Sequence, residues 1–229
     1  SATRGAMSLL VSTFQYPDGG ACYDAVLKHR QSSVFQVIDN KYGQIAGGWL
    51  AGCEQVASPN CGARPAGAKV ELVVVHNISL PPGEFGGPYI EQLFTNTLSP
   101  QEHPYFEAIA DLEVSAHFLI KRTGEVIQFV PTQSAAWHAG VSLWRGRERC
   151  NDFSIGIELE GTDTHLYTNE QYERLGEIIV KCRDAHPEIP RDAIVGHSDI
   201  APGRKTDPGE SFDWQELQSR LGVEGLPLG

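Results

Sequence analysis

The sequence predicts an α/β (α+β) fold in which a central mixed β-sheet is flanked by helices. Two observations support this prediction. Strand-like apolar runs alternate with segments of helical periodicity along most of the chain, and two of these runs are joined by a tight-turn signal. Alternation with helices is typical of parallel strands and a tight turn is typical of antiparallel ones, so we expect both pairings in one sheet.

The clearest strand signal is "VELVVVHN", residues 70–77, whose near-continuous β-branched run predicts a strand buried on both faces. The apolar spacing of residues 86–98 and 104–112 predicts helices of about three and about two turns. Between residues 115 and 131, two alternating runs meet at Arg122-Thr123-Gly124. This predicts a hairpin in which Gly124 supplies the positive φ of a tight turn.

The second half of the chain predicts two more strands and two more helices. In "DFSIGIELEG", residues 152–161, one strand face carries Ile155, Ile157 and Leu159 and the other carries Gly156, Glu158 and Glu160. Thr168 and Gln171 have the spacing of a capping box, which begins a helix that we expect to end near Ala185. A short strand over residues 193–197, a loop over 198–211 and a final helix over about 212–221 follow.

The length of 229 residues predicts one domain with an appendage. We expect residues 49–229 to form the main domain, and residues 7–48 to form an N-terminal extension of unknown role with a strand near residues 32–39. Met7 is the only methionine, so we expect a native start there, after six added residues 1–6.

Composition limits the classes of partner. The chain has 41% hydrophobic residues and no apolar run near the roughly 18 residues that a membrane helix needs, so we expect a soluble core and no membrane partner. The net charge of -11 argues against nucleic acid as the main partner. The five cysteines are an odd number without CxxC spacing, which favours reduced thiols in a cytoplasm.

Three residues in two distant segments are candidate metal ligands. His76 follows "ELVVV", His197 follows "AIVG", and Asp207 lies in "RKTDPG". Three nitrogen and oxygen ligands, with a fourth position left for water, are what a catalytic zinc site needs. Spacing alone leaves other interpretations open, because a histidine at a strand end is more often structural and Asp before Pro-Gly often opens a turn.

Two further residues are candidates for acid–base and electrostatic roles. Glu158 and Glu160 share one face of an otherwise apolar strand, so either at least one of them meets an interior or a cleft, or this face meets water. Lys205, taken alone, is interpreted as a solvated loop lysine.

Five segments carry more information together than the spacing does. In chain order they are "VVHNISLPPGEFGGP", "VSAHFLI", "AWHAGVS", "GRERCNDFSIGIELEGTDT" and "GHSDIAPGRKTDPG". This set resembles the zinc amidases that cut N-acetylmuramyl-L-alanine bonds in peptidoglycan, and most of all their cytoplasmic 1,6-anhydro-N-acetylmuramyl-L-alanine type. The resemblance extends from about Gly48 to Leu221 and excludes the extension.

The resemblance implies the same mixed-sheet fold and one Zn²⁺ bound by His76, His197 and Asp207, with no organic cofactor. It implies that Glu158 is the general base on the attacking water and that Lys205 stabilises the oxyanion of the tetrahedral intermediate.

We expect two kinds of substrate contact, one with the stem peptide and one with the sugar. The resemblance implies that Arg149 holds a carboxylate of the stem peptide, with a structural salt bridge as the alternative. We expect Asn77 to hold the peptide backbone, and Trp137, His138 and Tyr105 to form walls of the sugar pocket, with core packing as the alternative for Trp137 and His138. Glu113 departs from the pattern, since some relatives carry a basic residue there.

The implied reaction is hydrolysis of the amide bond between the lactyl group of 1,6-anhydro-N-acetylmuramic acid and L-Ala of the stem peptide. We expect a monomer that acts on small muropeptides in cytoplasmic peptidoglycan recycling, and the resemblance implies a link to β-lactamase regulation. Two alternatives stay open: a periplasmic amidase that acts on intact peptidoglycan, and a recognition module without catalysis, which would typically lack a metal ligand.

Overall fold

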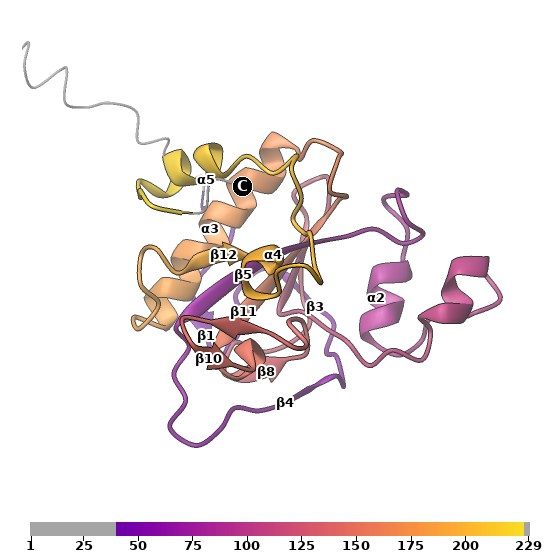
Figure 1. Cartoon of the computed structure of the whole chain (residues 1–229), viewed down its shortest axis with the longest axis horizontal. Coiled ribbons are helices and arrows are strands. Elements are labelled where there is room, and N and C mark those ends of the chain that lie inside the picture. Colours follow the sequence, from indigo (N-terminus) through magenta and orange to yellow (C-terminus); the bar gives the residue numbers. More distant parts are fainter. Residues whose placement is uncertain (1–39, 227–229) are drawn as a thin grey trace, which may run out of the picture. The chain divides into compact units, whose positions relative to one another are not determined.

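The structure of the chain is a computed structural model that describes residues 40–226 (Figure 1). The interpretations about residues 1–6, the start at Met7 and the strand near residues 32–39 lie outside the described residues. Among residues 40–226, no helix combines the length and the apolar character that crossing a bilayer requires.

A six-stranded mixed sheet of the order β12-β5-β11-β6-β7-β3 organises the described residues, which confirms the predicted fold class. In that order the strands are Ile194–Gly196, Leu72–Ile78, Ser154–Glu160, Phe118–Ile120, Val126–Gln128 and Glu54–Gln55. The first four strands run parallel, β6 and β7 form the predicted antiparallel hairpin, and β3 runs parallel to β7. Gly124 has a φ of 77° in the hairpin turn, as predicted.

Smaller elements surround this sheet. Three two-stranded sheets pair β1 (Ile45–Ala46) with β2 (Trp49–Leu50), β4 (Cys61–Ala63) with β8 (Ser134–Ala136), and β9 (Leu143–Trp144) with β10 (Arg147–Glu148). The helices are α2 (Tyr89–Phe94), α3 (Asn169–Ala185), α4 (His197–Ile200) and α5 (Trp214–Leu221), with 3-10 turns η1 (Pro104–Ala108) and η2 (Cys150–Asp152).

The two faces of the sheet are covered differently, and the two central strands β5 and β11 are buried on both. On one face, Val73, Val75, Ile155, Ile157 and Leu159 pack with residues of α3 and α5 that include Leu175, Ile178, Ile179 and Leu217. Figure 1 shows α3 and α5 side by side. On the other face, Leu72 and Val74 pack with Cys150 and Phe153. The near-continuous apolar run of β5 follows from this double burial.

Two predicted helices are shorter in the structure. The helix expected over residues 86–98 is α2, which ends at Phe94 because Asn96 adopts a positive φ of 58° and the Thr95 hydroxyl donates to the carbonyl of Glu91. The helix expected over residues 104–112 is the 3-10 turn η1, in which the His103 ring accepts a hydrogen bond from the Tyr105 amide.

Two boundaries near the site also differ from the prediction. The strand predicted over residues 193–197 ends at Gly196, and His197 begins the short helix α4, because the Asp199 carboxylate accepts a hydrogen bond from the Gly196 amide. The final helix begins at Trp214, since the Asp213 carboxylate caps it by accepting from the Gln215 and Glu216 amides.

Part of the expected extension packs against the main domain. The Tyr42 amide donates to the buried carboxylate of Glu177 on α3 over 2.6 Å, and Tyr42 and Leu50 belong to the core beneath α3. The β1–β2 hairpin spans the stretch where the domain boundary was expected. A boundary near residue 48 stays a prediction.

The capping box of α3 provides a test of the fold. The Thr168 hydroxyl accepts from the Gln171 amide over 3.1 Å and donates to the carbonyl of Arg122 over 2.9 Å. We expect Thr168→Ala to lower the free energy of unfolding by about 1 to 2 kcal/mol, measured by urea denaturation. Thr168→Ser keeps the hydroxyl and should retain most of this stability; equal losses in both variants would contradict the role of the cap.

Candidate active site

The candidate site lies where the parallel strands β12, β5 and β11 end. His76 is near the carboxyl end of β5, and the strand register pairs it directly with Glu158 of β11. His197 follows the last residue of β12. Since Val74 and His76 are two residues apart on β5, both point to the face away from α3. The carboxyl ends of parallel strands are where α/β sheets bind ligands.

Three potential ligand atoms converge at this edge. Nδ1 of His76 lies 3.0 Å from Nδ1 of His197 and 3.0 Å from Oδ2 of Asp207, and the last two atoms are also 3.0 Å apart. The structure thus brings together the three predicted ligands, although Asp207 is separated from His76 by most of the chain. Asp207 reaches the cluster because its carbonyl accepts a hydrogen bond from the Ser198 amide.

This donor set fits a zinc ion. Ligand atoms about 2.0 Å from a tetrahedral zinc lie about 3.3 Å apart, close to the separations found here. Burial lowers the pKa of His76 to about 4, so its ring is neutral at pH 7 and can offer a lone pair. Burial opposes the charged form of Asp207, but hydrogen bonds with His197 and His76 outweigh it and keep the pKa of the carboxyl below its usual range.

The loop that carries Asp207 is held by a second set of contacts. The Asn77 side-chain amide donates to Oδ1 of Asp163 over 2.8 Å and to the carbonyl of Pro208 over 3.0 Å. The Tyr167 hydroxyl donates to the same carbonyl, and the Thr206 hydroxyl donates to Oδ2 of Asp163. Asn77 therefore lies beside the ligands, and its amide hydrogens hold the loop that carries Asp207, while its contact with a peptide backbone stays a prediction.

Glu158 is buried at the edge of the cleft, with 9% of the residue exposed. This settles the question left open by its strand face, because both Glu158 and Glu160 meet the interior. Within the described residues, Oε2 of Glu158 has no hydrogen-bond partner. Burial, and then the charge of Asp207, raise the pKa of Glu158 well above its usual value, while Lys205 opposes the shift.

A cleft of about 390 Å³ opens in front of these residues. It is lined by His76, Glu158, His197, Lys205 and Asp207 on one side, and by Leu80, Phe94, Tyr105, Leu112, Val114 and Trp137 among others. Lys205 is exposed at this cleft, and Tyr105 and Trp137 also line it, while their role as walls of a sugar pocket stays a prediction. Glu113 is exposed, and only its neighbours Leu112 and Val114 are among the lining residues.

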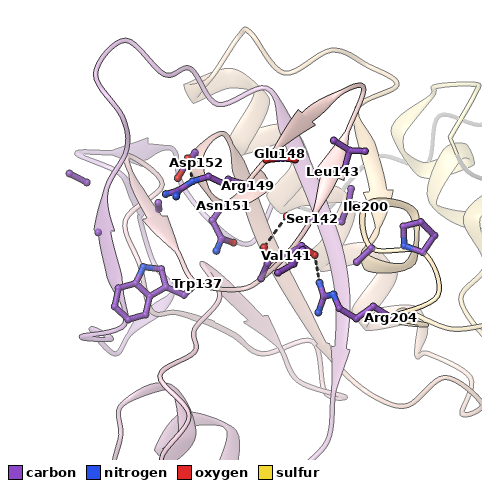
Figure 2. A pocket seen from close by; sticks show the side chains of 16 residues that line it. Trp137, Val141, Ser142, Leu143, Glu148, Arg149, Asn151, Asp152, Ile200 and Arg204 are labelled. Carbon is purple, nitrogen blue, oxygen red and sulfur yellow. Dashed lines mark hydrogen bonds and ion pairs between the residues drawn. The ribbon is translucent and has the colours of Figure 1, made fainter.

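A second cleft of about 810 Å³ adjoins the first and shares Trp137 with it (Figure 2). Arg149 lines this second cleft and not the first. Its side chain is 79% exposed, and Nε donates to Oδ2 of Asp152 over 2.9 Å. The ion pair named as the alternative is therefore present, while the role of Arg149 toward a substrate stays a prediction.

Sequence reasoning overlooked Arg204, which lines the second cleft opposite Arg149 in Figure 2. Its guanidinium donates to the carbonyls of Ala139 and Val141 over 2.7 and 2.6 Å and so holds the loop over residues 139–141. The signal was present in "GRKTDPG", where a second cation precedes Lys205.

His138 is also among the residues that line the first cleft, and its role as a wall of the sugar pocket stays a prediction. Both of its ring nitrogens face other side chains: Nδ1 lies 2.9 Å from Nε2 of His76, and Nε2 lies 3.1 Å from the Ser154 hydroxyl. Ser154 and Gly156, to which the sequence analysis assigned no role at the site, share the strand face of Glu158. Their spacing at every second position before Glu158 was the sequence signal that could have placed them on this face.

The fold and the site together define a hydrolytic enzyme, because a buried carboxylate without a partner lies next to a cluster that can bind an electrophilic cation. Residues 66–210 match the family described as N-acetylmuramoyl-L-alanine amidase. The 1,6-anhydro-N-acetylmuramyl-L-alanine amidase AmpD of Escherichia coli (strain K12) is 59% identical over 177 residues, which are 77% of this chain and 96% of that protein.

Solved structures agree with this match. The crystal structure of a Se-Met AmpD derivative has a TM-score of 0.76 and 55% identity, and the match covers 78% of this chain and 99% of that one. The amidase AmiD from E. coli, in complex with the substrate anhydro-N-acetylmuramic acid-L-Ala-D-γ-Glu-L-Lys, has a TM-score of 0.50 and 28% identity over 70% of this chain and 61% of that one. The chain belongs to the N-acetylmuramoyl-L-alanine amidase family and, within it, to the AmpD type.

Glu160 provides a test of how the rim of the site is held. Its buried carboxylate accepts hydrogen bonds from the Gly86 amide over 2.5 Å and from the Arg122 amide over 3.0 Å. Glu160→Gln replaces one acceptor with a donor, so we expect a loss of about 1 to 3 kcal/mol in urea denaturation and faster hydrogen exchange at Gly86. Glu84→Gln, at an exposed position of the same loop, is the control. Unchanged exchange at Gly86 would contradict this role.

Proposed function

We propose that the chain is a zinc-dependent amidase that cleaves the bond between the lactyl group of 1,6-anhydro-N-acetylmuramic acid and L-Ala of the stem peptide. The observation that carries this proposal is the cluster of His76, His197 and Asp207 beside the buried carboxylate of Glu158. The name of the AmpD relative from E. coli, a 1,6-anhydro-N-acetylmuramyl-L-alanine amidase, supports an anhydro-muropeptide as the substrate. The setting, by likeness to that type, is peptidoglycan recycling in the cytoplasm.

His76 and His197 would hold Zn²⁺ through Nδ1, and Asp207 through Oδ2. A zinc ion bound there would lower the pKa of a water molecule and polarise the scissile carbonyl. All three ligands come from one chain, which supports a monomer as the active unit.

Glu158 is the proposed group that moves the proton. The residue lines the cleft, and its buried Oε2 has no hydrogen-bond partner among residues 40–226, which supports a role in accepting a proton from the attacking water. A raised pKa makes the protonated carboxyl stable enough to deliver that proton afterwards to the amide nitrogen of L-Ala, which then leaves. Raising the pKa toward neutrality suits a group that must both accept and donate.

Lys205 supplies positive charge at the same cleft. Lys205 lines this cleft together with Glu158 and His76. We assign it to stabilise the negative charge that develops on the carbonyl oxygen when water adds, a contribution often worth about 3 to 4 kcal/mol.

The two clefts suggest how the substrate lies. Tyr105 and Trp137 give the first cleft apolar walls suited to the bicyclic anhydro-sugar. The second cleft carries Arg149, whose guanidinium suits a carboxylate of the stem peptide. Trp137 lines both clefts, so it would lie near the junction of sugar and peptide.

Removal of metal tests zinc dependence. After treatment with a chelator, we expect loss of at least about 100-fold in turnover of an anhydro-muropeptide and recovery when one equivalent of Zn²⁺ is restored. Magnesium, which prefers octahedral oxygen ligands, should not restore turnover. Full turnover by a rigorously metal-free protein would overturn the proposal. A strong preference for intact peptidoglycan over anhydro-muropeptides would overturn the proposed substrate.

Substitution of Glu158 separates the base from the metal site. Glu158→Gln and Glu158→Ala should lower kcat by about 100- to 10,000-fold while one zinc per chain stays bound, because neither change removes a ligand atom. Zinc content by atomic absorption and steady-state kinetics measure the two effects. Glu224→Gln, at an exposed position near the end of the described residues, is the matched control. Undiminished turnover would exclude Glu158 as the base.

A further inference from the structure

A buried chain of hydrogen bonds leads from His76 away from the candidate metal site. Nε2 of His76 lies 2.9 Å from Nδ1 of His138, and Nε2 of His138 lies 3.1 Å from Oγ of Ser154. The Ser154 hydroxyl then lies 2.6 Å from the carbonyl oxygen of Cys150. The chain ends in the core, because Ser154 and Cys150 are completely buried.

The last acceptor sets the direction of every bond in this chain. A carbonyl oxygen only accepts, so the single hydroxyl proton of Ser154 is donated to Cys150. The Ser154 oxygen must then accept from Nε2 of His138, which leaves Nδ1 of that neutral ring as an acceptor. His138 therefore accepts from Nε2–H of His76, and the lone pair of His76 is left on Nδ1.

His197 is oriented in the same way by a shorter route. Its Nε2 lies 3.1 Å from the carbonyl oxygen of Ala139 and 3.4 Å from a guanidinium nitrogen of Arg204. That nitrogen donates its two hydrogens to the carbonyls of Ala139 and Val141, so Nε2 of His197 donates to Ala139 and Nδ1 carries the lone pair. The two histidines thus point the same ring nitrogen at Asp207. The tautomer of His197 is set directly by a backbone carbonyl, and that of His76 is set by a backbone carbonyl through two intervening side chains.

Gly156 makes room for this arrangement. A Cβ atom built at Gly156 would lie only 2.4 Å from Cγ of His138 and 2.6 Å from its Nδ1. The ring of His138 therefore rests against the backbone of β11, between the side chains of Ser154 and Glu158 on the same strand face. A side chain at this position would push His138 away from His76.

We infer that His138 and Ser154 are positioning residues that fix the tautomer of His76, so that its Nδ1 lone pair faces the ligand cluster before any metal arrives. The inference rests on the proposed function because it takes Nδ1 of His76 as a zinc ligand. Outer groups of this kind typically contribute about 10- to 100-fold to metal affinity, because they remove the need to reorient a ligand.

The tautomer itself can be observed without metal or substrate. Long-range ¹H–¹⁵N correlation spectra of the metal-free, ¹⁵N-labelled chain at pH 7.5 should show His76, His138 and His197 as Nε2–H tautomers. In Ser154→Ala, His138 and His76 should become mixtures, while His197 stays unchanged because its partner is Ala139. His76 as the Nδ1–H tautomer in the unsubstituted chain would overturn the inference.

Zinc affinity, measured by competition with a chromogenic chelator, gives a second readout. We expect Kd to rise about 10-fold in Ser154→Ala and about 100-fold in His138→Leu. His138→Asn should recover most of the loss, because its side-chain oxygen can accept where Nδ1 does. In the His138→Asn background, Ser154→Ala should change the Kd for zinc by less than about 2-fold further, since the series of hydrogen bonds between Ser154 and His76 is already interrupted.

Ser58→Ala is the matched control, because Ser58 is also a buried serine that donates to a carbonyl, that of Phe94, outside this chain of bonds. Equal losses of zinc affinity in Ser58→Ala and Ser154→Ala would overturn the inference. If the protein shows the Nε2–H tautomers but binds no zinc, the proposed function is contradicted, while the inference that His138 and Ser154 fix the tautomer of His76 is supported. The two failures are therefore distinguishable.

Discussion

The parallel register of β5 and β11 is the constraint on which the site depends. It pairs His76 with Glu158, so a ligand and a carboxylate that are far apart in the chain become neighbours on one sheet face. Because side chains alternate along a strand, a slip of one residue in either strand would turn its own member of this pair into the core beneath α3. Burial of Val73, Val75, Ile155 and Ile157 against α3 opposes such a slip.

The same two strands supply both stability and chemistry. The face toward α3 is apolar, while the other face of β11 carries Ser154, Gly156, Glu158 and Glu160 in succession. Ser154 and Glu160 are satisfied by buried hydrogen bonds, and Gly156 gives space to the His138 ring. Glu158 alone keeps an unpartnered oxygen among the described members of this face, and burial raises its pKa. A group left unsatisfied on an otherwise satisfied face is typical of a residue that acts on a ligand.

The loops that complete the site are held by polar contacts more than by packing. Asp163, Asn77 and Tyr167 fasten the segment around Pro208, which places Asp207 against the two histidines. Arg204 binds the carbonyls of Ala139 and Val141, and Ala139 in turn orients His197. Residues that are not themselves candidate ligands thus influence the geometry of the ligands.

The sequence by itself determined the mixed sheet, the hairpin at Gly124 and the capping box at Thr168, because local periodicity and turn signals encode them. Through its long motifs it also predicted the candidate set of His76, His197, Asp207, Glu158 and Lys205. It could not determine the lengths of α2 and η1, since Thr95 and Asn96 end α2 through local contacts that compete with helical periodicity. Only the tertiary structure decided the surroundings of His138, Asn77 and Arg149, because their partners Ser154, Asp163 and Asp152 are chosen by how strands and loops meet. The residue type determines which chemical groups a side chain carries, but the packing of distant segments determines which partner those groups contact.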